Sequence, residues 1–509
     1  MEKYLDQSVV GQFALGDAMY FGTLTLGSSK TILTIYLDAE SAPLISQPYP
    51  QDLAGVLYDL TKVTLLDSIF IGGGTYTKQV PLGGYARSRQ LIFDVGYVLF
   101  SDSSVNGHQR IFDCLDFSIP NSNDLFFFRS FTSLIDVPDH LPKDLITEDL
   151  RLSKEKFGLS MDVNTYSFGD SPKVFLYTGA SILSTLRLPL GTLNIKNNPI
   201  YTMPTNKGFK VENEISCYLD FDEPKSFWEI TKEIESILQL LDLLLGKRQI
   251  LKSYKLKVNN NKVHPKVFDV YHSAHETEAL NDSIHPLERL IQVENETEEF
   301  EKVINDWLLK QEEWKFPRGH YFSVFRKPTY TPDTIVKLAN VFDLVPDRAY
   351  SAEPLSDEIL IAKKLCRDAF HPLEDSPERS SVLLNLKRLG EKTLKHKIID
   401  RYEIIKSSGF VDLKYMNDVI TNSVDCRNYF VHGNYRKFDY IENFTEFCFL
   451  IDTLLFIYGI SEMLEAGWTF KNWKPDELNQ HFFSRYIVNY DLNLERLKEV
   501  SKKGFGIQV

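Results

Sequence analysis

The sequence has few cysteines, and none is placed as in a metal finger. Five cysteines are spread over 509 residues without a C-x-x-C pair: Cys114, Cys217, Cys366, Cys426 and Cys448. Disulfide-stapled secreted domains and zinc fingers both need closely spaced cysteines. We therefore expect reduced thiols and a cytoplasmic protein.

An excess of basic residues is also missing. The formal net charge of the chain is −13 at pH 7. Proteins that bind DNA by general electrostatics usually carry a basic excess that meets the phosphates. The composition excludes this kind of binding for the chain as a whole, so any contact with nucleic acid must be local.

Long apolar runs are scarce as well. The most apolar stretch, FCFLIDTLLFIYGI, is shorter than the roughly 20 residues that a membrane-spanning helix needs, and it contains Asp452. The opening MEKYLDQS lacks the charged-then-apolar layout of a signal peptide. We expect no membrane segment.

The sequence contains no clear nucleotide-binding loop and no clear metal-binding motif. The glycine run IGGGTYT is typical of a turn and continues into neither G-x-G-x-x-G nor a P-loop. Nothing in the sequence therefore indicates an ATP-driven motor. His264, His272, His275 and Glu276 could hold a metal, but histidine clusters without cysteines usually do not. We expect neither a cofactor nor a metal.

The first part of the chain has the pattern of an antiparallel β structure. Up to about residue 220, short segments such as YFGTLTLG, KTILTIYLD and QLIFDVGYVLF are rich in β-branched and aromatic residues and alternate with turn-forming ones. This spacing predicts a sandwich or a barrel. A helix, KSFWEITKEIESILQLLDLLLG, and two further strands, ILKSYKLKV and KVFDVYH, complete this part.

After about residue 275 the apolar residues follow a helical period. The candidate helices include PDTIVKLANVF, SDEILIAKKLCRDAF, SVLLNLKRLGEKTLKHKIIDRYEIIKS and LKYMNDVITNSVDCRNYFVH. Short connections favour antiparallel neighbours in a bundle. We therefore predict an α+β multidomain protein, with a β-rich, sandwich-like domain at residues 1–275 and a helical region at 276–509 whose bundle core spans about 350–470.

One candidate helix carries a charge on its apolar stripe. At 100° per residue the stripe consists of Leu413, Met416, Ile420, Val424 and Val431. Arg427 falls inside it. A guanidinium keeps its charge and is costly to bury unpaired, so Arg427 must meet a carboxylate, reach a solvated seam or serve a phosphate-containing ligand.

Two more polar residues accompany this arginine. Asn428 and His432 are four residues apart and are therefore neighbours on one flank, where the amide can orient the imidazole. Gly433 is the residue type that ends helices, which places His432 in the last turn with an exposed edge. Arginine, asparagine and histidine thus converge near one helix end.

The segment RNYFVH resembles the R-N-x-x-x-H signature of HEPN domains, helical bundles many of which are metal-independent RNases of toxin and antiviral systems. The whole layout, with GQFALGDAMYFGTLTLG near the start and a HEPN bundle after it, resembles the ApeA family of phage-defence proteins. The resemblance implies that Arg427 and His432 are catalytic and that Asn428 supports them. It also implies a homodimer in which both copies of the motif line one cleft.

These residue types suit RNA cleavage without a metal. The 2′-hydroxyl of RNA can attack the adjacent phosphate if a histidine transfers protons and an arginine braces the added negative charge. Between residues 381 and 440, eleven Lys and Arg stand against seven Asp and Glu, a net charge of +4 that leaves −17 for the rest of the chain. This contrast fits a local RNA-facing patch, although a charge run is more often a solvated helix face.

We therefore expect a HEPN endoribonuclease of abortive-infection defence. Its substrate is RNA, with tRNA as one candidate, and its N-terminal domain holds the nuclease in check until a phage-derived trigger binds. Two alternatives stay open: a catalytically silent HEPN bundle that binds nucleotides or RNA, and a scaffold whose β-sandwich recognises a protein or glycan. Arg427 could also be a structural arginine paired with a carboxylate, and Arg367 and His371 in RDAFHP look like a helix-end pair.

Overall fold

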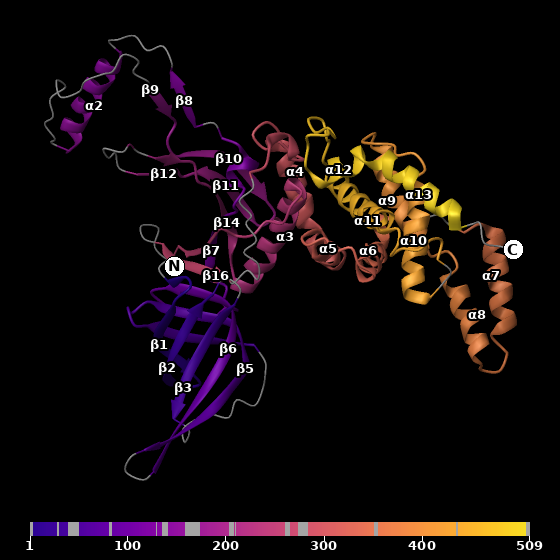
Figure 1. Cartoon of the computed structure of the whole chain (residues 1–509), viewed down its shortest axis with the longest axis horizontal. Helices are drawn as coiled ribbons and strands as arrows, with labels where there is room; N and C mark the ends of the chain where they lie inside the picture. Colours follow the sequence, from indigo (N-terminus) through magenta and orange to yellow (C-terminus); the bar gives the residue numbers. More distant parts are fainter. Residues whose placement is uncertain are drawn as a thin grey trace. The chain divides into compact units, whose positions relative to one another are not determined.

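The computed structural model describes residues 4–27, 30–38, 50–80, 84–128, 130–134, 141–157, 174–202, 208, 210–259, 265–272, 283–350, 355–433 and 436–504 (Figure 1). The chain divides into two compact units, which are described separately. Unit 1 consists of residues 1–226 and 251–281, and unit 2 consists of residues 227–250 and 282–509.

The first six strands of unit 1 close into a ring. They are β1 (Ser8–Leu15), β2 (Ala18–Leu26), β3 (Thr31–Asp38), β4 (Gln51–Leu57), β5 (Lys62–Val80) and β6 (Gly84–Ser101). Their pairs are antiparallel, and β5 pairs with both β4 and β6, so the order β6-β3-β2-β1-β4-β5 returns to β6. Closure removes the free edges that would otherwise pair with other chains. Of the two arrangements that the sequence left open, these strands adopt the barrel.

Alternate side chains fill the interior of this ring. In β1, every second residue from Val9 to Leu15 is buried, which is the period that a strand with one face on a core requires. Phe13 is fully buried. A Cβ atom at Gly22 or Gly55 would lie within 2.9 Å or 2.5 Å of the Phe13 side chain. The two glycines therefore make the room that this phenylalanine occupies.

Six more strands extend the same sheet from the end of β6. In spatial order they are β16 (Lys266–His272), β15 (Ser253–Val258), β7 (Phe112–Ser118), β14 (Ile215–Lys225), β11 (Gly191–Asn197) and β10 (Ser181–Leu188). Unit 1 also contains the strand pairs β8 (Phe131–Leu134) with β9 (Val174–Tyr177) and β12 (Ile200–Tyr201) with β13 (Val211–Glu212), and the helices α1 (Ser122–Phe126) and α2 (Leu141–Phe157).

The antiparallel, β-rich first region is thus confirmed, but the expected turn at IGGGTYT is wrong. These residues lie inside β5, where the register against β6 shifts between Phe70 and Gly72. An extra residue in one strand bends it locally, and glycine tolerates the required backbone conformation. The glycine run therefore marks a bulge in a long strand.

Unit 2 is helical. Its helices are α3 (Phe227–Leu245), α4 (Thr297–Leu309), α5 (Gln311–Phe325), α6 (Pro332–Leu344), α7 (Asp357–Phe370), α8 (Pro377–Arg388), α9 (Leu394–Ser407), α10 (Met416–His432), α11 (Phe444–Glu465), α12 (Phe482–Val488) and α13 (Tyr490–Gly504), with short 3₁₀ turns at Pro286–Glu288 and Asp347–Ala349. The predicted helical region is confirmed. The stretch predicted as one helix over 381–407 is two helices, because Gly390 adopts a left-handed φ of 104° and Thr393 caps α9.

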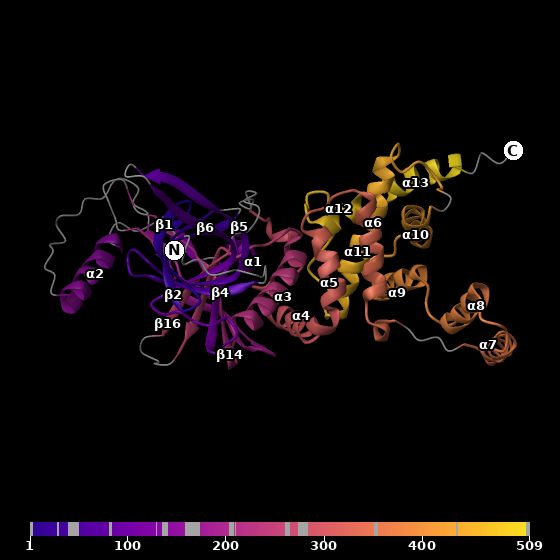
Figure 2. The ribbon, with the colours of Figure 1, turned by 90° about the horizontal axis from the view of Figure 1, so that it is seen from below.

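The helix α11 runs through unit 2 beside α6, α9 and α10 (Figure 2). It is longer than the apolar run seen in the sequence and is, by length and composition alone, apolar enough to cross a membrane, with a mean hydropathy of 1.7. However, 83% of that apolar window is buried inside the structure. A helix that is apolar all round is expected at the centre of a bundle, so packing within unit 2 accounts for this composition.

A network of buried charges ties three helices together. Arg318 of α5 donates to Glu462 of α11 at 3.1 Å. Arg401 of α9 lies 3.6 Å from the same glutamate and donates to Glu465 at 2.5 Å and to Ser461 at 2.9 Å. Because two arginines share one buried carboxylate, each group has a partner and the register of α5, α9 and α11 is fixed.

Candidate functional site

The helix α10 brings the RNYFVH motif to its C-terminal end. The buried residues of this helix are Met416, Val419, Ile420, Ser423, Val424 and Cys426. Gly433 adopts a left-handed φ of 66°, and its N–H donates to the carbonyl of Tyr429 at 2.9 Å. The prediction that Gly433 ends the helix is confirmed.

The predicted apolar stripe is wrong at its end. Val431 is 42% exposed rather than buried. Residues 427–433 are all at least partly exposed, so the last turn of α10 is not covered like the turns before it. This exposure leaves His432 accessible and Arg427 half-buried.

Arg427 makes contacts with three neutral groups. Its Nη1 atom donates to Oδ1 of Asn428 at 3.1 Å and lies 3.2 Å from Nε2 of His432. Its Nη2 atom donates to Oδ1 of Asn340 on α6 at 3.2 Å. The structure thus brings together the three residues singled out in the sequence and adds a fourth, Asn340.

These partners leave the charge of Arg427 uncompensated. Among the residues that the structure describes, no carboxylate forms an ion pair with this guanidinium, and Asp425, the nearest acid in sequence, pairs instead with Lys437 at 2.6 Å. The Nε atom of Arg427 is buried and has no hydrogen-bond partner. Amide oxygens satisfy N–H groups without neutralising the cation, so the motif retains a full positive charge for an anionic ligand.

The contact with Arg427 also fixes which nitrogen of His432 carries the proton. A guanidinium only donates, so Nε2 of His432 must accept in this arrangement. The neutral imidazole then carries its proton on Nδ1. His432 therefore presents an unprotonated nitrogen beside a cation at an accessible helix end.

Asn428 contacts a different group from the one expected. The sequence predicted that its amide orients the imidazole of His432, whereas its oxygen accepts from Arg427. Because Arg427 in turn contacts His432, the amide acts on the imidazole through the guanidinium. The residue missed in the sequence, Asn340, holds the other terminal nitrogen; the one signal for it was a lone amide within the apolar segment LANVF.

Aromatic packing holds the motif in place. The ring of Phe430 lies 5.9 Å from that of Phe447 on α11 and 5.6 Å from that of Tyr440, measured between centroids. Burial raises the pKa of the Cys426 thiol, which keeps this neighbour of Arg427 protonated and therefore a poor nucleophile. The chemistry of the site thus rests on arginine, histidine and the two amides.

The other candidates from the sequence do not join this site. His264, His275 and Glu276 lie outside the described residues, and His272 of β16 stacks on Tyr97 with ring centroids 4.5 Å apart. Within the described ranges, no group of three potential metal ligands occurs. Arg367 and His371 are at the end of α7, where the N–H of His371 donates to the carbonyl of Arg367 at 2.9 Å, as expected for a helix-end pair.

Two family models match the chain. The model of ApeA N-terminal domain 1 matches residues 8–307, and the model of the Apea-like HEPN domain matches residues 337–471, which include Asn340 and the whole RNYFVH motif. No curated protein and no solved structure was found to match. The first match spans more than half of the chain, and the two occur in the order that the sequence predicted. The chain therefore belongs to the ApeA family and fits a HEPN-type phage-defence protein.

Proposed function

We propose that the protein is a metal-independent endoribonuclease whose catalytic residues are Arg427 and His432. The observation that carries this proposal is the half-buried guanidinium of Arg427, held by two amide oxygens and an imidazole nitrogen with no carboxylate among its described contacts. A structural arginine in a bundle is usually paired with an acid, as Arg318 and Arg401 are. A cation left without one is suited to hold a phosphate.

The proposed reaction uses the 2′-hydroxyl of RNA as the nucleophile. His432 takes the proton of the hydroxyl on Nε2, the 2′ oxygen forms a bond to phosphorus, and the bond from phosphorus to the 5′ oxygen breaks as that oxygen gains a proton. The products are a 2′,3′-cyclic phosphate and a 5′-hydroxyl. Arg427 stabilises the extra negative charge on the phosphate in the transition state.

The contact between Arg427 and His432 gives substrate binding a second effect. The lone pair of Nε2 is occupied by Nη1 of Arg427 while the site is empty. When a phosphate draws the guanidinium toward itself, Nε2 is released to act as a base. The base is thus available only when the phosphate is in place.

Two histidines are needed if one accepts a proton while the other donates one. The motif supplies one histidine per chain, so we propose a homodimer through the HEPN bundle in which the second copy provides the acid. Within the described residues, the motif is not accompanied by the carboxylate cluster that two-metal nucleases use. Activity is therefore expected to persist in EDTA.

We further propose that unit 1 gates the nuclease in abortive-infection defence. A nuclease that cuts RNA of its own cell must be held inactive until a trigger binds. Opening a gate from about 1% to about 99% requires the trigger to favour the open state by about 5 kcal/mol. A phage-derived molecule bound by unit 1 would supply this difference.

The test is an RNA cleavage assay with the full-length dimer, comparing the wild type with Arg427→Ala and His432→Ala. Both variants should lose cleavage while their thermal melting stays within a few degrees of the wild type, because neither side chain is part of the buried core. Cyclic-phosphate ends should be found on the products. Full activity in His432→Ala, or activity that EDTA abolishes and magnesium restores, would contradict the mechanism.

A further inference from the structure

The helices α7 and α8 form a hairpin that lies outside the core of unit 2. No residue of α7 is buried, and within the described residues these two helices pack mainly on each other. The hairpin is nevertheless well ordered by hydrogen bonds: Arg379 donates to the carbonyls of Phe370 and His371, at 3.0 Å and 2.7 Å. Because the hairpin is held together by hydrogen bonds but contributes little to the core of unit 2, core packing does not explain the residues on its surface.

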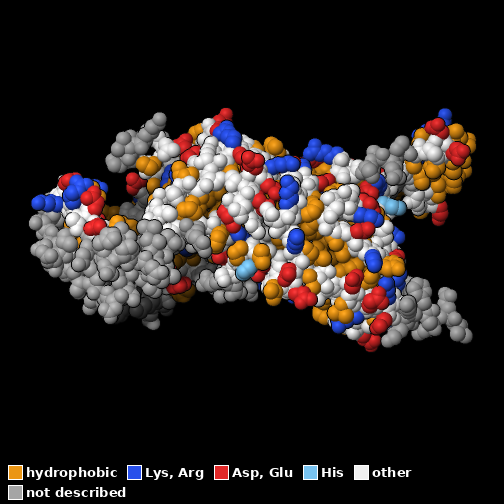
Figure 3. Space-filling model, turned by 90° about the horizontal axis from the view of Figure 1, so that it is seen from above, with side chains coloured by type: hydrophobic (Ala, Val, Ile, Leu, Met, Phe, Trp, Pro, Cys, Tyr) orange, Lys and Arg blue, Asp and Glu red, His pale blue; other side chains and the backbone are white. Residues whose placement is uncertain are grey.

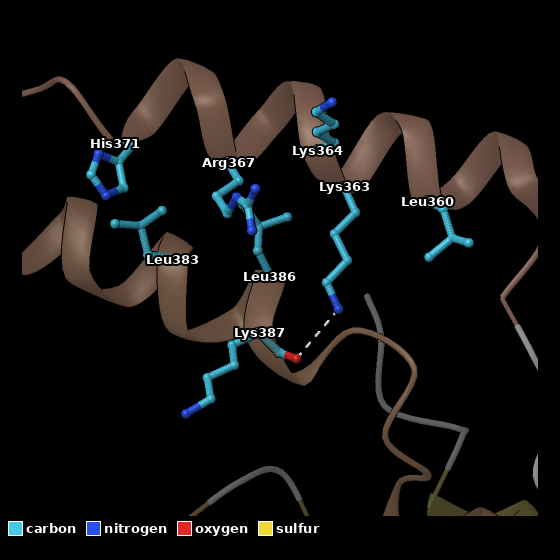
Figure 4. A pocket seen from close by; sticks show the side chains of 8 residues that line it. All are labelled: Leu360, Lys363, Lys364, Arg367, His371, Leu383, Leu386 and Lys387. Atoms are coloured by element: carbon cyan, nitrogen blue, oxygen red, sulfur yellow. Dashed lines mark hydrogen bonds between the residues drawn. The ribbon is translucent and has the colours of Figure 1, made fainter.

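Between the two helices lies a groove of about 540 Å³ (Figure 4). Its apolar lining consists of Leu360 from α7 and of Leu383 and Leu386 from α8. Arg367 and His371 point from α7 toward α8 in Figure 4. Lys364 and Lys387 also line the groove, with side chains that extend outward from it in Figure 4, and none of its described lining residues is an acid.

The charges of the hairpin are segregated. Its acids lie at helix starts, in the turn or beside Arg367: Asp357, Glu358, Asp368, Glu374, Asp375 and Glu378. Lys363 is occupied as a cap, because its Nζ atom donates to the carbonyl of Leu389 at 2.8 Å. Among the described residues, the one acid that pairs with the Arg367 side chain is Asp368, at a distance of 3.8 Å between two exposed side chains. The groove therefore offers cations that are not committed to strong intramolecular pairs.

Exposed apolar side chains accompany the charged ones on both helices. Ile361 and Leu365 of α7 are 60% and 66% exposed, and Leu384 of α8 is 49% exposed. Apolar side chains cover much of the hairpin in the space-filling view (upper right in Figure 3). Exposed apolar patches rimmed by polar residues mark interaction sites on proteins.

We propose that this groove binds single-stranded RNA, the phosphates on its cations and the ribose and base faces on its leucines, with Arg367 able to stack on a base. This inference rests on the proposed function, for which it supplies a second RNA contact outside the RNYFVH motif. Single strands combine a charged backbone with apolar base faces, and both features have counterparts in the groove. In a chain with a net charge of −13, a binding surface for RNA must be local.

The groove is tested by measuring RNA binding rather than cleavage. A fluorescein-labelled 20-nucleotide single-stranded RNA is titrated with full-length protein in the His432→Ala background, so that it is not consumed. The test variant carries Arg367→Gln and Lys387→Gln. The control carries Lys471→Gln and Lys474→Gln, which remove two other exposed cations of unit 2. Thermal melting checks that both variants are folded.

The test variant should bind RNA at least fivefold more weakly than the control at about 100 mM salt. Loss of two phosphate contacts should also lower the slope of log affinity against log salt by about 1.4, since each contact on a single strand contributes about 0.7. Between 50 and 200 mM salt the difference between the two variants should therefore shrink about sevenfold.

Equal RNA affinity and equal salt slopes in the two variants would overturn the proposal. The proposal would also be overturned if RNA binding did not depend on the groove while binding of a synthetic amphipathic helix of Leu and Glu depended on Arg367 and Lys387. That result would indicate a protein partner. Cleavage by the wild type combined with unchanged RNA binding in the test variant would refute the groove but not the nuclease. Groove-dependent binding without any cleavage by the wild type, in an assay sensitive enough to detect the roughly 1% of molecules that are open without a trigger, would support the groove and refute the nuclease.

Discussion

The prediction that most sharply separates a catalytic from a structural Arg427 concerns Asn340. This residue accepts a hydrogen bond from Nη2 of Arg427 at 3.2 Å without carrying a charge. Asn340→Asp keeps the shape and the acceptor but places a carboxylate beside the guanidinium. Asn340→Ala removes the acceptor. If Arg427 serves a phosphate, the aspartate should be the worse of the two for activity, although it is the better partner for the arginine.

The expected magnitudes follow from the geometry. A carboxylate at position 340 would lie roughly 7 Å from a phosphate held by Arg427 and repel it by about 2–3 kcal/mol at an effective dielectric constant of about 20. This corresponds to a loss of about 30- to 150-fold in kcat/KM. Asn340→Ala loses one hydrogen bond to a partly exposed charged group, about 1–1.5 kcal/mol, which predicts a loss of about tenfold.

The assay is steady-state cleavage of a fluorogenic RNA, accompanied by thermal melting. Asn340→Asp should melt at or above the wild-type temperature, because it gains an ion pair, while its activity falls. Asn417→Asp, an equivalent change at an exposed position of α10, is the control and should retain activity. If Asn340→Asp is as active as the wild type, or if Asn340→Ala is the more damaging variant, the uncompensated charge of Arg427 is not used for binding phosphate.

Three further predictions concern the scaffold. Gly433→Ala should lower the free energy of unfolding by about 1 kcal/mol, measured by urea denaturation. The added Cβ meets no atom of the described residues within 4 Å, so the left-handed backbone is what disfavours alanine. Glu462→Ala should cost about 3–5 kcal/mol in the same measurement, because Arg318 and Arg401 lose a shared partner; a cost below 1 kcal/mol would refute this role. Burial raises the pKa of Asp452 to about 7, although the hydrogen bond from Tyr330 opposes this shift. The folded protein therefore keeps the proton of Asp452 at pH values where the unfolded chain has already released it. As a result, this residue lowers the stability of the fold as the pH rises from about 4 to about 7. The stability of Asp452→Asn relative to the wild type should therefore increase by about 2 kcal/mol between pH 5 and pH 7, and a constant difference would contradict the shift.

The local features of the site could be predicted from the sequence, whereas its long-range contacts could not. The helix α10, its end at Gly433 and the proximity of Arg427 to His432 all follow from helical periodicity and residue type. Asn340 is 87 residues away from Arg427, and its role depends on how α6 packs on α10. Periodicity within one helix contains no information about that packing.

The same distinction applies to the fold. Alternation along β1–β6 identified strands, but ring closure depends on the second partner of β5, which strand spacing does not specify. The helix α3 precedes β15 and β16 in the chain and yet packs in unit 2, where the carbonyl of its Ser236 accepts from the indole of Trp307 at 2.9 Å. A helical fragment that begins at residue 276 would lack this helix. Comparisons of gated and ungated activity should therefore use the full chain.

The central claim is most directly tested by the ends of the RNA that the full-length protein produces. Purified wild-type protein, incubated with single-stranded RNA in EDTA at a concentration high enough to detect the roughly 1% of molecules that are open without a trigger, should yield 2′,3′-cyclic phosphate and 5′-hydroxyl ends, and His432→Ala should yield no products. These ends can be identified by mass spectrometry. Products with 5′-phosphate ends, or cyclic-phosphate products formed equally well by His432→Ala, would contradict the assignment of Arg427 and His432 as the catalytic pair.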